Sequence, residues 1–145
     1  MRMLVTAAAL MFAVAAQAAD IGQIKSVAGA VHIERDGRIV AAPIGSSVRQ
    51  SDKLVTGADG TVGVTFLDNS LISAGPNSVL VLEHYSYDST TAAGRFDASL
   101  KKGTIAVVSG KMVKQKPESM QIRTPATVMG VRGTEFVVRV EDSGR

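Results

Sequence analysis

Residues that could carry out chemistry are few and far apart in this chain of 145 amino acids. Cysteine is absent, which excludes a disulfide framework, a thiol nucleophile and a thiolate zinc site. The histidines, His32 and His84, each lie alone in a strand-like segment, where a histidine is more often packed or solvated than a ligand. Asp88 follows His84 by four residues, a spacing that does not converge on one metal ion in an extended segment. We therefore expect no metal and no cofactor.

The acidic residues favour structural roles over catalysis. Asp36, Asp59 and Asp68 each precede Gly or Asn in a turn-like sequence, and the alternating carboxylates of a calcium loop are absent. No Gly-x-Ser-x-Gly nucleophile elbow occurs in the sequence. We therefore expect that the protein is not an enzyme.

Basic residues gather towards the C-terminus. Residues 20–99 carry six basic and nine acidic side chains, whereas residues 100–145 carry nine basic and four acidic ones. A series of lysines in this part has no acidic residue among its members: Lys101, Lys102, Lys111, Lys114 and Lys116. Such a series can steer an anionic partner, or it can keep an edge strand and its loop soluble. Nucleic acid is not expected, because no aromatic side chains alternate with these lysines to stack on bases.

The first 18 residues are typical of a secretory signal peptide. Met1-Arg2-Met3 is a charged start, residues 4–16 form an apolar run, and Ala16-Gln17-Ala18 has the small-x-small pattern of a cleavage site. The run is shorter than the roughly 20 residues that a membrane-spanning helix needs. We expect cleavage after residue 18, a mature domain over residues 19–145, no stable membrane insertion and a periplasmic location.

The rest of the chain has the pattern of an all-β protein. Residues 61–66 alternate apolar with small or polar side chains, which is the period of a half-buried strand. Arg35-Asp36-Gly37-Arg38 and Asp68-Asn69 are turn signals between short apolar runs. No segment after residue 18 has apolar residues at helical spacing with caps. This pattern allows a β sandwich, a small barrel or a short solenoid after the N-terminal signal helix.

Four segments give more specific expectations. Residues 79–82 are apolar at every position, which predicts a strand covered on both faces. Residues 85–97 have few apolar side chains, which predicts a surface loop or an irregular hairpin tip. Residues 110–117 are rich in Lys, Gly and Pro and predict a linker. Residues 120–124 predict a short strand that Pro125 ends, because proline lacks an amide donor.

The order and spacing of several motifs resemble the FecR domain family over roughly residues 25–140. Residues 51–57 with Asp59-Gly60 are similar to its Gly-Asp-x-Leu-x-Thr-Gly pattern, and residues 64–70 are similar to its Phe-x-Asp-Gly-Ser turn. Residues 122–128 and 131–136 are similar to its Thr-Pro and Val-Arg-Gly-Thr-x-Phe stretch. The residues that carry the resemblance are Asp52, Thr56, Gly57, Gly60, Asp68, Ser70, Thr124, Pro125, Arg132, Gly133, Thr134, Glu135 and Phe136.

The resemblance implies a periplasmic, non-catalytic module, and it favours a compact β-solenoid-like stack over a two-sheet β sandwich. In the regulators that name the family, a cytoplasmic anti-sigma segment and a membrane helix precede this domain, and the exported part senses a TonB-dependent outer-membrane receptor. Because this chain starts with a signal peptide and ends at Arg145, we expect a stand-alone exported domain. Such a domain does not transmit a signal across the membrane by itself, and iron signalling is not carried over.

The motif residues also have structural interpretations. Gly57, Gly60 and Gly75 suit turn positions with positive φ. Arg132 and Glu135 lie three residues apart, close enough for an ion pair that would fix the turn between them. The alternative is that Arg132 binds the carboxylate of a ligand.

Two functions follow from these features. The first is a protein-interaction or signalling module that docks a cell-envelope protein through strand edges or through the lysine series. The second is a module that binds an envelope polymer or an anionic small ligand. Sugar sites usually use exposed aromatic side chains, and the candidates here, Tyr85 and Tyr87, are few. We therefore predict the first function.

Overall fold

The computed structural model describes residues 19–131 and 135–141. The predicted signal peptide, residues 1–18, and the motif residues Arg132, Gly133 and Thr134 lie outside the described residues. The strands are β1 (Asp20–Ala28), β2 (Val31–Arg35), β3 (Arg38–Ala41), β4 (Ser47–Arg49), β5 (Lys53–Thr56), β6 (Thr61–Phe66), β7 (Leu71–Ala74), β8 (Val79–Tyr87), β9 (Gly94–Val108), β10 (Met120–Arg123), β11 (Val128–Gly130) and β12 (Glu135–Val140). Two short helical turns, α1 (Lys111–Gln115) and η1 (Pro117–Ser119), lie between β9 and β10.

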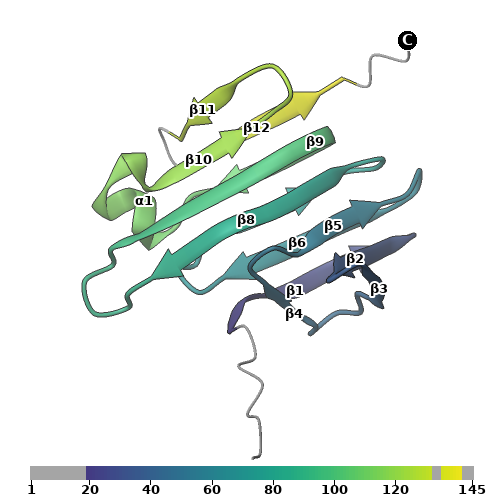
Figure 1. Ribbon diagram of the computed structural model, residues 1–145, viewed down its shortest axis with the longest axis horizontal. Coiled ribbons are helices and arrows are strands. Elements are labelled where there is room, and N and C mark those ends of the chain that lie inside the picture. The colour runs from purple at the N-terminus through teal and green to yellow at the C-terminus, as the bar shows by residue number, and fades with distance from the viewer. Residues whose placement is uncertain (1–18, 132–134, 142–145) are drawn as a thin grey trace, which may run out of the picture.

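Most of the described chain forms one curled sheet that resembles half of a barrel (Figure 1). Its strands lie in the order β3-β2-β5-β8-β9-β7-β6-β1-β4. All neighbours in this order are antiparallel. The prediction of an all-β fold is confirmed. Neither of the finer alternatives, the solenoid-like stack or the two-sheet sandwich, is confirmed by this arrangement.

Strand β9 joins the two halves of the sheet. Its first part, residues 94–102, pairs with β8, and residues 105–108 pair with β7. On its other side, β10 runs parallel to residues 96–99, and β12 runs antiparallel to residues 103–108. The long strand therefore contacts four others, and its course decides where they lie.

The sheet turns where β9 passes Gly103. This residue has a φ of +93°, a conformation that L side chains rarely adopt. The register with β8 also shifts here, since Val79 pairs with Lys102 and Leu80 with Leu100, which leaves Lys101 as the extra residue of a β-bulge. A bulge bends its strand and increases the local twist, so this short stretch accounts for the turn of the sheet.

The concave side of the sheet holds the hydrophobic core. Val62, Val64 and Phe66 of β6 are all buried, as the alternation in the sequence predicts. Phe66, Tyr85 and Phe96 come from three strands and form an aromatic cluster with ring centroids 4.7–5.7 Å apart. Burial of such side chains contributes roughly 1.5–3 kcal/mol each, which makes this cluster a main source of stability at one end of the sheet.

The prediction that residues 85–97 form a surface loop or an irregular hairpin tip is correct only for a hairpin tip at residues 88–93, and is wrong for the residues on either side of it. Strand β8 continues to Tyr87 and β9 begins at Gly94, so only residues 88–93 connect them. Tyr85 and Phe96 lie opposite each other in the ladder and are both buried. These two inward aromatic residues outweigh the polar composition around them.

Two further expectations are corrected. The predicted linker, residues 110–117, contains α1 and the first residue of η1. The helix forms because Met112 and Val113 are buried against the core while the lysines beside them face outwards. The strand at residues 79–82 is covered on one face only, since Leu80 and Leu82 are buried and the valines between them are half-buried. The strand at the start of the C-terminal motif is confirmed, as β10 ends at Arg123, before Pro125.

Within the described ranges, no helix combines the length and the apolar character needed to span a membrane.

Candidate functional site

Asp52 is a buried carboxylate that ties β2 to the turn before β5. It is 1% exposed, and its two oxygens accept hydrogen bonds from Arg35, at 2.8 Å from Nε and at 2.7 Å from Nη2. The same carboxylate accepts the backbone N–H of Arg49 at 2.8 Å. The hydrogen bonds that Arg35 donates to Asp52 raise the pKa of the Arg35 guanidinium above its ordinary value. The first motif aspartate thus supports the fold from a buried position.

Thr56 and Ser78 form a second buried centre that links β5, β8 and β9. The Thr56 hydroxyl donates to the carbonyl of Gly75 at 2.6 Å and accepts the N–H of Ser78 at 2.9 Å. The Ser78 hydroxyl in turn accepts the N–H of Thr104 at 3.0 Å. The motif threonine therefore holds the turn before β8 against the bend of β9.

The prediction that Gly57, Gly60 and Gly75 have positive φ is wrong, since the glycines of positive φ in the described chain lie elsewhere. At Gly57 and Gly60, the lack of room for a side chain explains the glycine instead. A Cβ at Gly60 would lie 2.1 Å from the carbonyl oxygen of Ala30, and one at Gly57 would lie 3.1 Å from the Ala30 Cβ. At Gly75 the nearest atom would be 3.7 Å away, which is ordinary contact.

Asp68 and Ser70 form the turn between β6 and β7, and Tyr85 bonds to it from β8. Asp68 Oδ1 accepts the Ser70 hydroxyl at 2.6 Å and the Tyr85 hydroxyl at 3.1 Å. The Tyr85 oxygen accepts the N–H of Asp68 at 3.1 Å. Burial, and after it the charge of Asp68, raises the pKa of the Tyr85 hydroxyl well above its ordinary value of 10. Tyr85 is therefore an interior residue and offers no platform for a sugar.

The C-terminal motif lies on β10, on β12 and on the turn after β10. The Thr124 hydroxyl accepts the N–H of Thr127 at 3.1 Å, which closes a turn that carries the exposed Pro125. On β12, Glu135 is exposed and Phe136 is half-buried. The roles predicted for Arg132, an ion pair with Glu135 or a bond to a ligand, involve a residue outside the described ranges and stay predictions.

The predicted lysine series is divided between two places on the surface. Lys101 and Lys102 lie on β9 at the bend, whereas Lys111 and Lys114 lie on α1 and Lys116 directly follows it. Lys101 lies seven positions along β9 from Gly94, beside which α1 packs, and this is roughly 23 Å at 3.3 Å per residue. The two groups of lysines therefore form separate surfaces.

A cleft opens beside Lys101 and Lys102, at the place where β10 and β12 diverge from β9. The pairing of β10 ends at Arg123 opposite Ser99, and that of β12 ends at Val140 opposite Gly103. Residues 100–102 consequently have no strand partner on this side within the described chain. The space there has a volume of about 460 Å³ and is lined by Lys101, Lys102, Thr124, Pro125, Ala126, Arg139, Val140 and Glu141. We refer to this space as the bend cleft.

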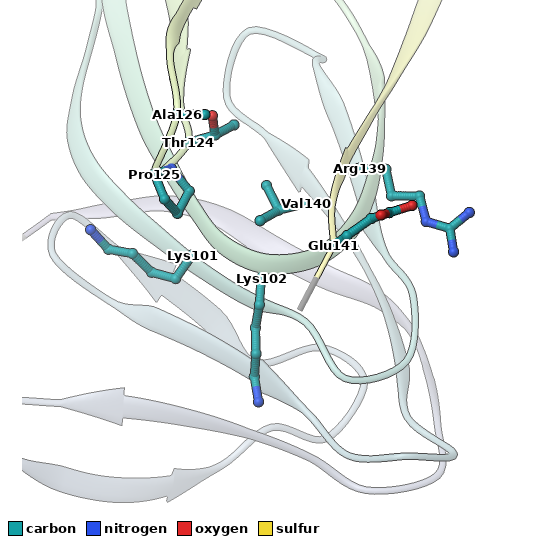
Figure 2. A pocket seen from close by; sticks show the side chains of 8 residues that line it. All are labelled: Lys101, Lys102, Thr124, Pro125, Ala126, Arg139, Val140 and Glu141. Atoms are coloured by element: carbon teal, nitrogen blue, oxygen red, sulfur yellow. The ribbon is translucent and has the colours of Figure 1, made fainter. Parts of the chain in front are cut away.

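Charge and apolar surface meet in the bend cleft. Figure 2 shows Pro125 and Val140 directed towards its centre, with Lys101 running below Pro125 and Arg139 directed away on the far side. Lys101 and Lys102 are exposed and take part in no ion pair within the described part of the chain. The bend cleft thus combines Lys101, Lys102 and Arg139 with one acidic lining residue, Glu141, beside an apolar wall. This excess of positive charge suits a ligand that carries both carboxylates and apolar groups.

The remaining residues of chemical interest do not converge. His32 Nε2 lies 3.5 Å from Glu34 Oε1 on the same strand, and His84 is exposed opposite Asp97. In the described ranges, no three His, Cys, Asp or Glu side chains lie close enough to hold a metal ion. Asp97 accepts a bond from Arg95 Nε at 2.7 Å, while its other oxygen is buried with no partner among the described residues.

Sequence reasoning missed the part that β12 contributes to the bend cleft. Arg139 and Val140 lie 37 or more positions after Lys102, and only the pairing of β12 with β9 brings them together. The sequence of residues 135–140 contains the alternation of a strand, but it does not identify the strand with which it pairs. Gly103 also went unnoticed, although a glycine within an apolar β-rich run is a recognised signal of a bulge.

Comparison with known proteins gives one match. A family model described as FecR protein matches residues 52–145, which is more than half of the chain. No curated protein and no solved structure matches the chain. The matched region includes Asp52, the Thr56 and Asp68 centres and every residue that lines the bend cleft.

Proposed function

The chain belongs to the FecR protein family, and from this we propose that it is an exported, non-catalytic module of a signalling or regulatory system. Its role in this proposal is to bind a protein of the cell envelope in the periplasm. The partner places a segment that carries both acidic and apolar residues in the bend cleft. No catalytic step is assigned to the protein.

The observation that carries the proposal is the combination of groups in the bend cleft. Lys101 and Lys102 offer two ammonium groups that can donate charge-assisted hydrogen bonds to carboxylates. Pro125 and Val140 offer apolar surface beside them. The backbone of residues 100–102 lacks a strand partner there, so an extended segment can add main-chain hydrogen bonds to β9.

The motif carboxylates support a non-catalytic role. Asp52 and Asp68 are each 1% exposed, and their oxygens are bonded to Arg35, Ser70 and Tyr85. A general acid or base has to reach a proton of its substrate. Carboxylates held in this way instead fix the turns around the sheet.

The experiment that tests this proposal starts from Ala126, an exposed residue at the rim of the bend cleft. A photoreactive amino acid is placed at this position, cells are irradiated, and the crosslinked product is identified by mass spectrometry. We expect one envelope protein, crosslinked through a segment that contains Asp or Glu. The double variant K101E/K102E should abolish the crosslink, because it turns attraction for carboxylates into repulsion.

The matched control is the double variant K111E/K114E, which reverses two charges on α1 and should leave the crosslink intact. Equal loss in both variants, or no loss in either, would contradict the proposal. A crosslink to wall polymer instead of protein would favour the second candidate function, binding of an envelope polymer or an anionic small ligand. The volume of the bend cleft, about 460 Å³, lies within the range of small-ligand sites and keeps this candidate open.

A further inference from the structure

Strand β12 forms an open edge of the sheet. Within the described residues it pairs with β9 alone, and β9 lies on one side of it. Figure 1 shows β12 towards the upper rim of the molecule. At six residues β12 is longer than the other edge strands, β3, β4 and β11, which have three or four. Very short edge strands discourage edge-to-edge pairing, and β12 does not have that protection.

The exposed face of β12 is self-complementary. Glu135, Val137 and Arg139 are exposed and alternate with half-buried or buried residues, so they share one face. Val137 is 65% exposed, which is unusual for a large apolar residue in a sheet. A negative and a positive charge lie two residues to either side of this valine. A second β12 in antiparallel orientation therefore presents Arg139 to Glu135, and Glu135 to Arg139.

We propose that two copies of this chain associate through β12, antiparallel about a two-fold axis at Val137. In this register Val137 lies opposite Val137, and each Glu135 lies opposite an Arg139 of the second copy. The half-buried Phe136 lies opposite the buried Val138, so the inner faces of the two sheets also continue. The second copy is the occupant of this edge, and the association is isologous.

Other registers lack this match. A shift of β12 by a single residue places exposed side chains of one copy beside buried side chains of the other. A two-fold axis at Val138 keeps the faces aligned but places Glu135 opposite Glu141, two like charges. Directly opposed like charges destabilise a strand pair, whereas opposite charges stabilise it. The register with the axis at Val137 places exposed residues opposite exposed ones and half-buried residues opposite buried ones. It also places each Glu135 opposite an Arg139.

The test is a charge-exchange series measured by sedimentation equilibrium on the purified full chain. The wild type should form a concentration-dependent dimer. E135K and R139E should each weaken the dimer by about tenfold or more, because two symmetry-related pairs change from attraction to repulsion. The double variant E135K/R139E restores opposite charges in both pairs and should recover the dimer. Glu135 and Arg139 are exposed, so the fold should persist in all three variants, as circular dichroism can verify.

Lys25→Glu on β1 and Glu118→Lys on η1 are the matched controls, since each reverses one exposed charge away from β12. Both should dimerise like the wild type. A wild type that stays monomeric, or a double variant that fails to recover the dimer, overturns the proposal. The association does not involve Lys101 or Lys102, so its failure leaves the proposed function of the bend cleft untouched.

Discussion

At the scale of single residues, the motif side chains mainly hold turns and strands together through hydrogen bonds. Asp52 holds Arg35 and the Arg49 backbone, and Asp68 holds Ser70 and Tyr85. Each of these carboxylates is buried with its partners already in place. A buried charge that loses its partner is costly, so these positions tolerate little change.

Replacement of Asp52 by Asn tests this role. The substitution removes the charge that Arg35 pairs with and leaves the guanidinium only partly exposed, at 21%. We expect the free energy of unfolding to fall by about 2–4 kcal/mol. Asp36→Asn is the matched control, because Asp36 is exposed in a hairpin turn with φ of 52° where Asn is equally suitable. Urea denaturation of both variants measures the change in the free energy of unfolding. A similar decrease in Asp52→Asn and Asp36→Asn would contradict the role given to Asp52.

Tyr85 makes a prediction about alkaline pH. Its pKa is raised in the folded protein, so the unfolded chain loses this proton first as the pH rises. The stability that depends on the neutral hydroxyl is therefore complete below about pH 10 and falls as the pH rises further. Tyr85→Phe should cost about 1–3 kcal/mol at pH 7, since the buried N–H of Asp68 loses its acceptor. The Tyr85→Phe substitution should also reduce the loss of stability that occurs as the pH rises above about 10.

The measurement is urea denaturation at pH 7 and pH 11 on the wild type, Tyr85→Phe and the half-buried control Tyr87→Phe. The relevant quantity is the difference between the variants in the loss of stability from pH 7 to pH 11. An identical alkaline loss in the wild type and in Tyr85→Phe would show that this hydroxyl does not contribute to it.

At the scale of elements, the bend of β9 decides where β10 and β12 separate and thus where the bend cleft opens. A Cβ at Gly103 would lie 2.1 Å from the Ser78 hydroxyl oxygen and 2.5 Å from its Cα, and φ is +93°. Gly103→Ala should therefore lower the free energy of unfolding by at least about 3 kcal/mol, from backbone strain and steric overlap together.

Gly45 provides the control for this prediction. Its φ of +92° is almost the same, but a Cβ there would meet nothing within 4 Å. Gly45→Ala should cost only the backbone strain, roughly 1–2 kcal/mol. Chemical denaturation of the two variants separates strain from overlap. Equal losses would mean that the contact between Gly103 and Ser78 is unimportant for the bend.

Local patterns made several elements predictable, while pairing between distant strands was not. The alternation of residues 61–66 and the turn at Asp36 predicted β6 and the β2–β3 hairpin correctly. Residues 85–87 and 94–97 were misjudged because Tyr85 and Phe96, which pair with each other across the ladder, outweigh the polar side chains around them. The short α1 was missed because Met112 and Val113 are too few to show a helical period.

The candidate site was predictable in part for the same reason. Lys101 and Lys102 stood out as charges in the sequence and do line the bend cleft. Their separation from Lys111 depends on the course of β9, and the contribution of Arg139 depends on the register of β12. Neither property is encoded within a window of neighbouring residues. Charge runs therefore indicated the chemistry of the surface but not its geometry.

At the scale of the whole molecule, the proposed function requires export of the protein to the periplasm. If residues 1–18 are a cleaved signal peptide, the protein in the periplasmic fraction should begin at Ala19. Intact mass spectrometry of that fraction measures this directly. Replacement of Ala18 by Arg should block cleavage, because the site requires a small residue, and Gln17→Glu should process normally. A full-length chain that stays in the cytoplasm would contradict the proposed location.

The bend cleft and the β12 edge give the molecule two adjoining surfaces for association. Lys101 and Lys102 belong to the first, and Glu135 and Val137 to the second, whereas Arg139 borders both. Dimerisation through β12 would bring two bend clefts into one assembly. A partner with two acidic segments would then bind with avidity, although each cleft also functions alone in this account.

The most direct test of partner binding at the bend cleft uses the purified protein that the crosslinking experiment identifies. Isothermal titration calorimetry measures its affinity for the wild type, K101E/K102E and K111E/K114E. We expect K101E/K102E to bind at least about tenfold more weakly than the wild type, which corresponds to about 1.4 kcal/mol. K111E/K114E should remain within about twofold of the wild type, since rim charges remote from the contact contribute little. Equal affinities for all three forms, or a greater loss in K111E/K114E, would contradict the assignment of partner binding to the bend cleft.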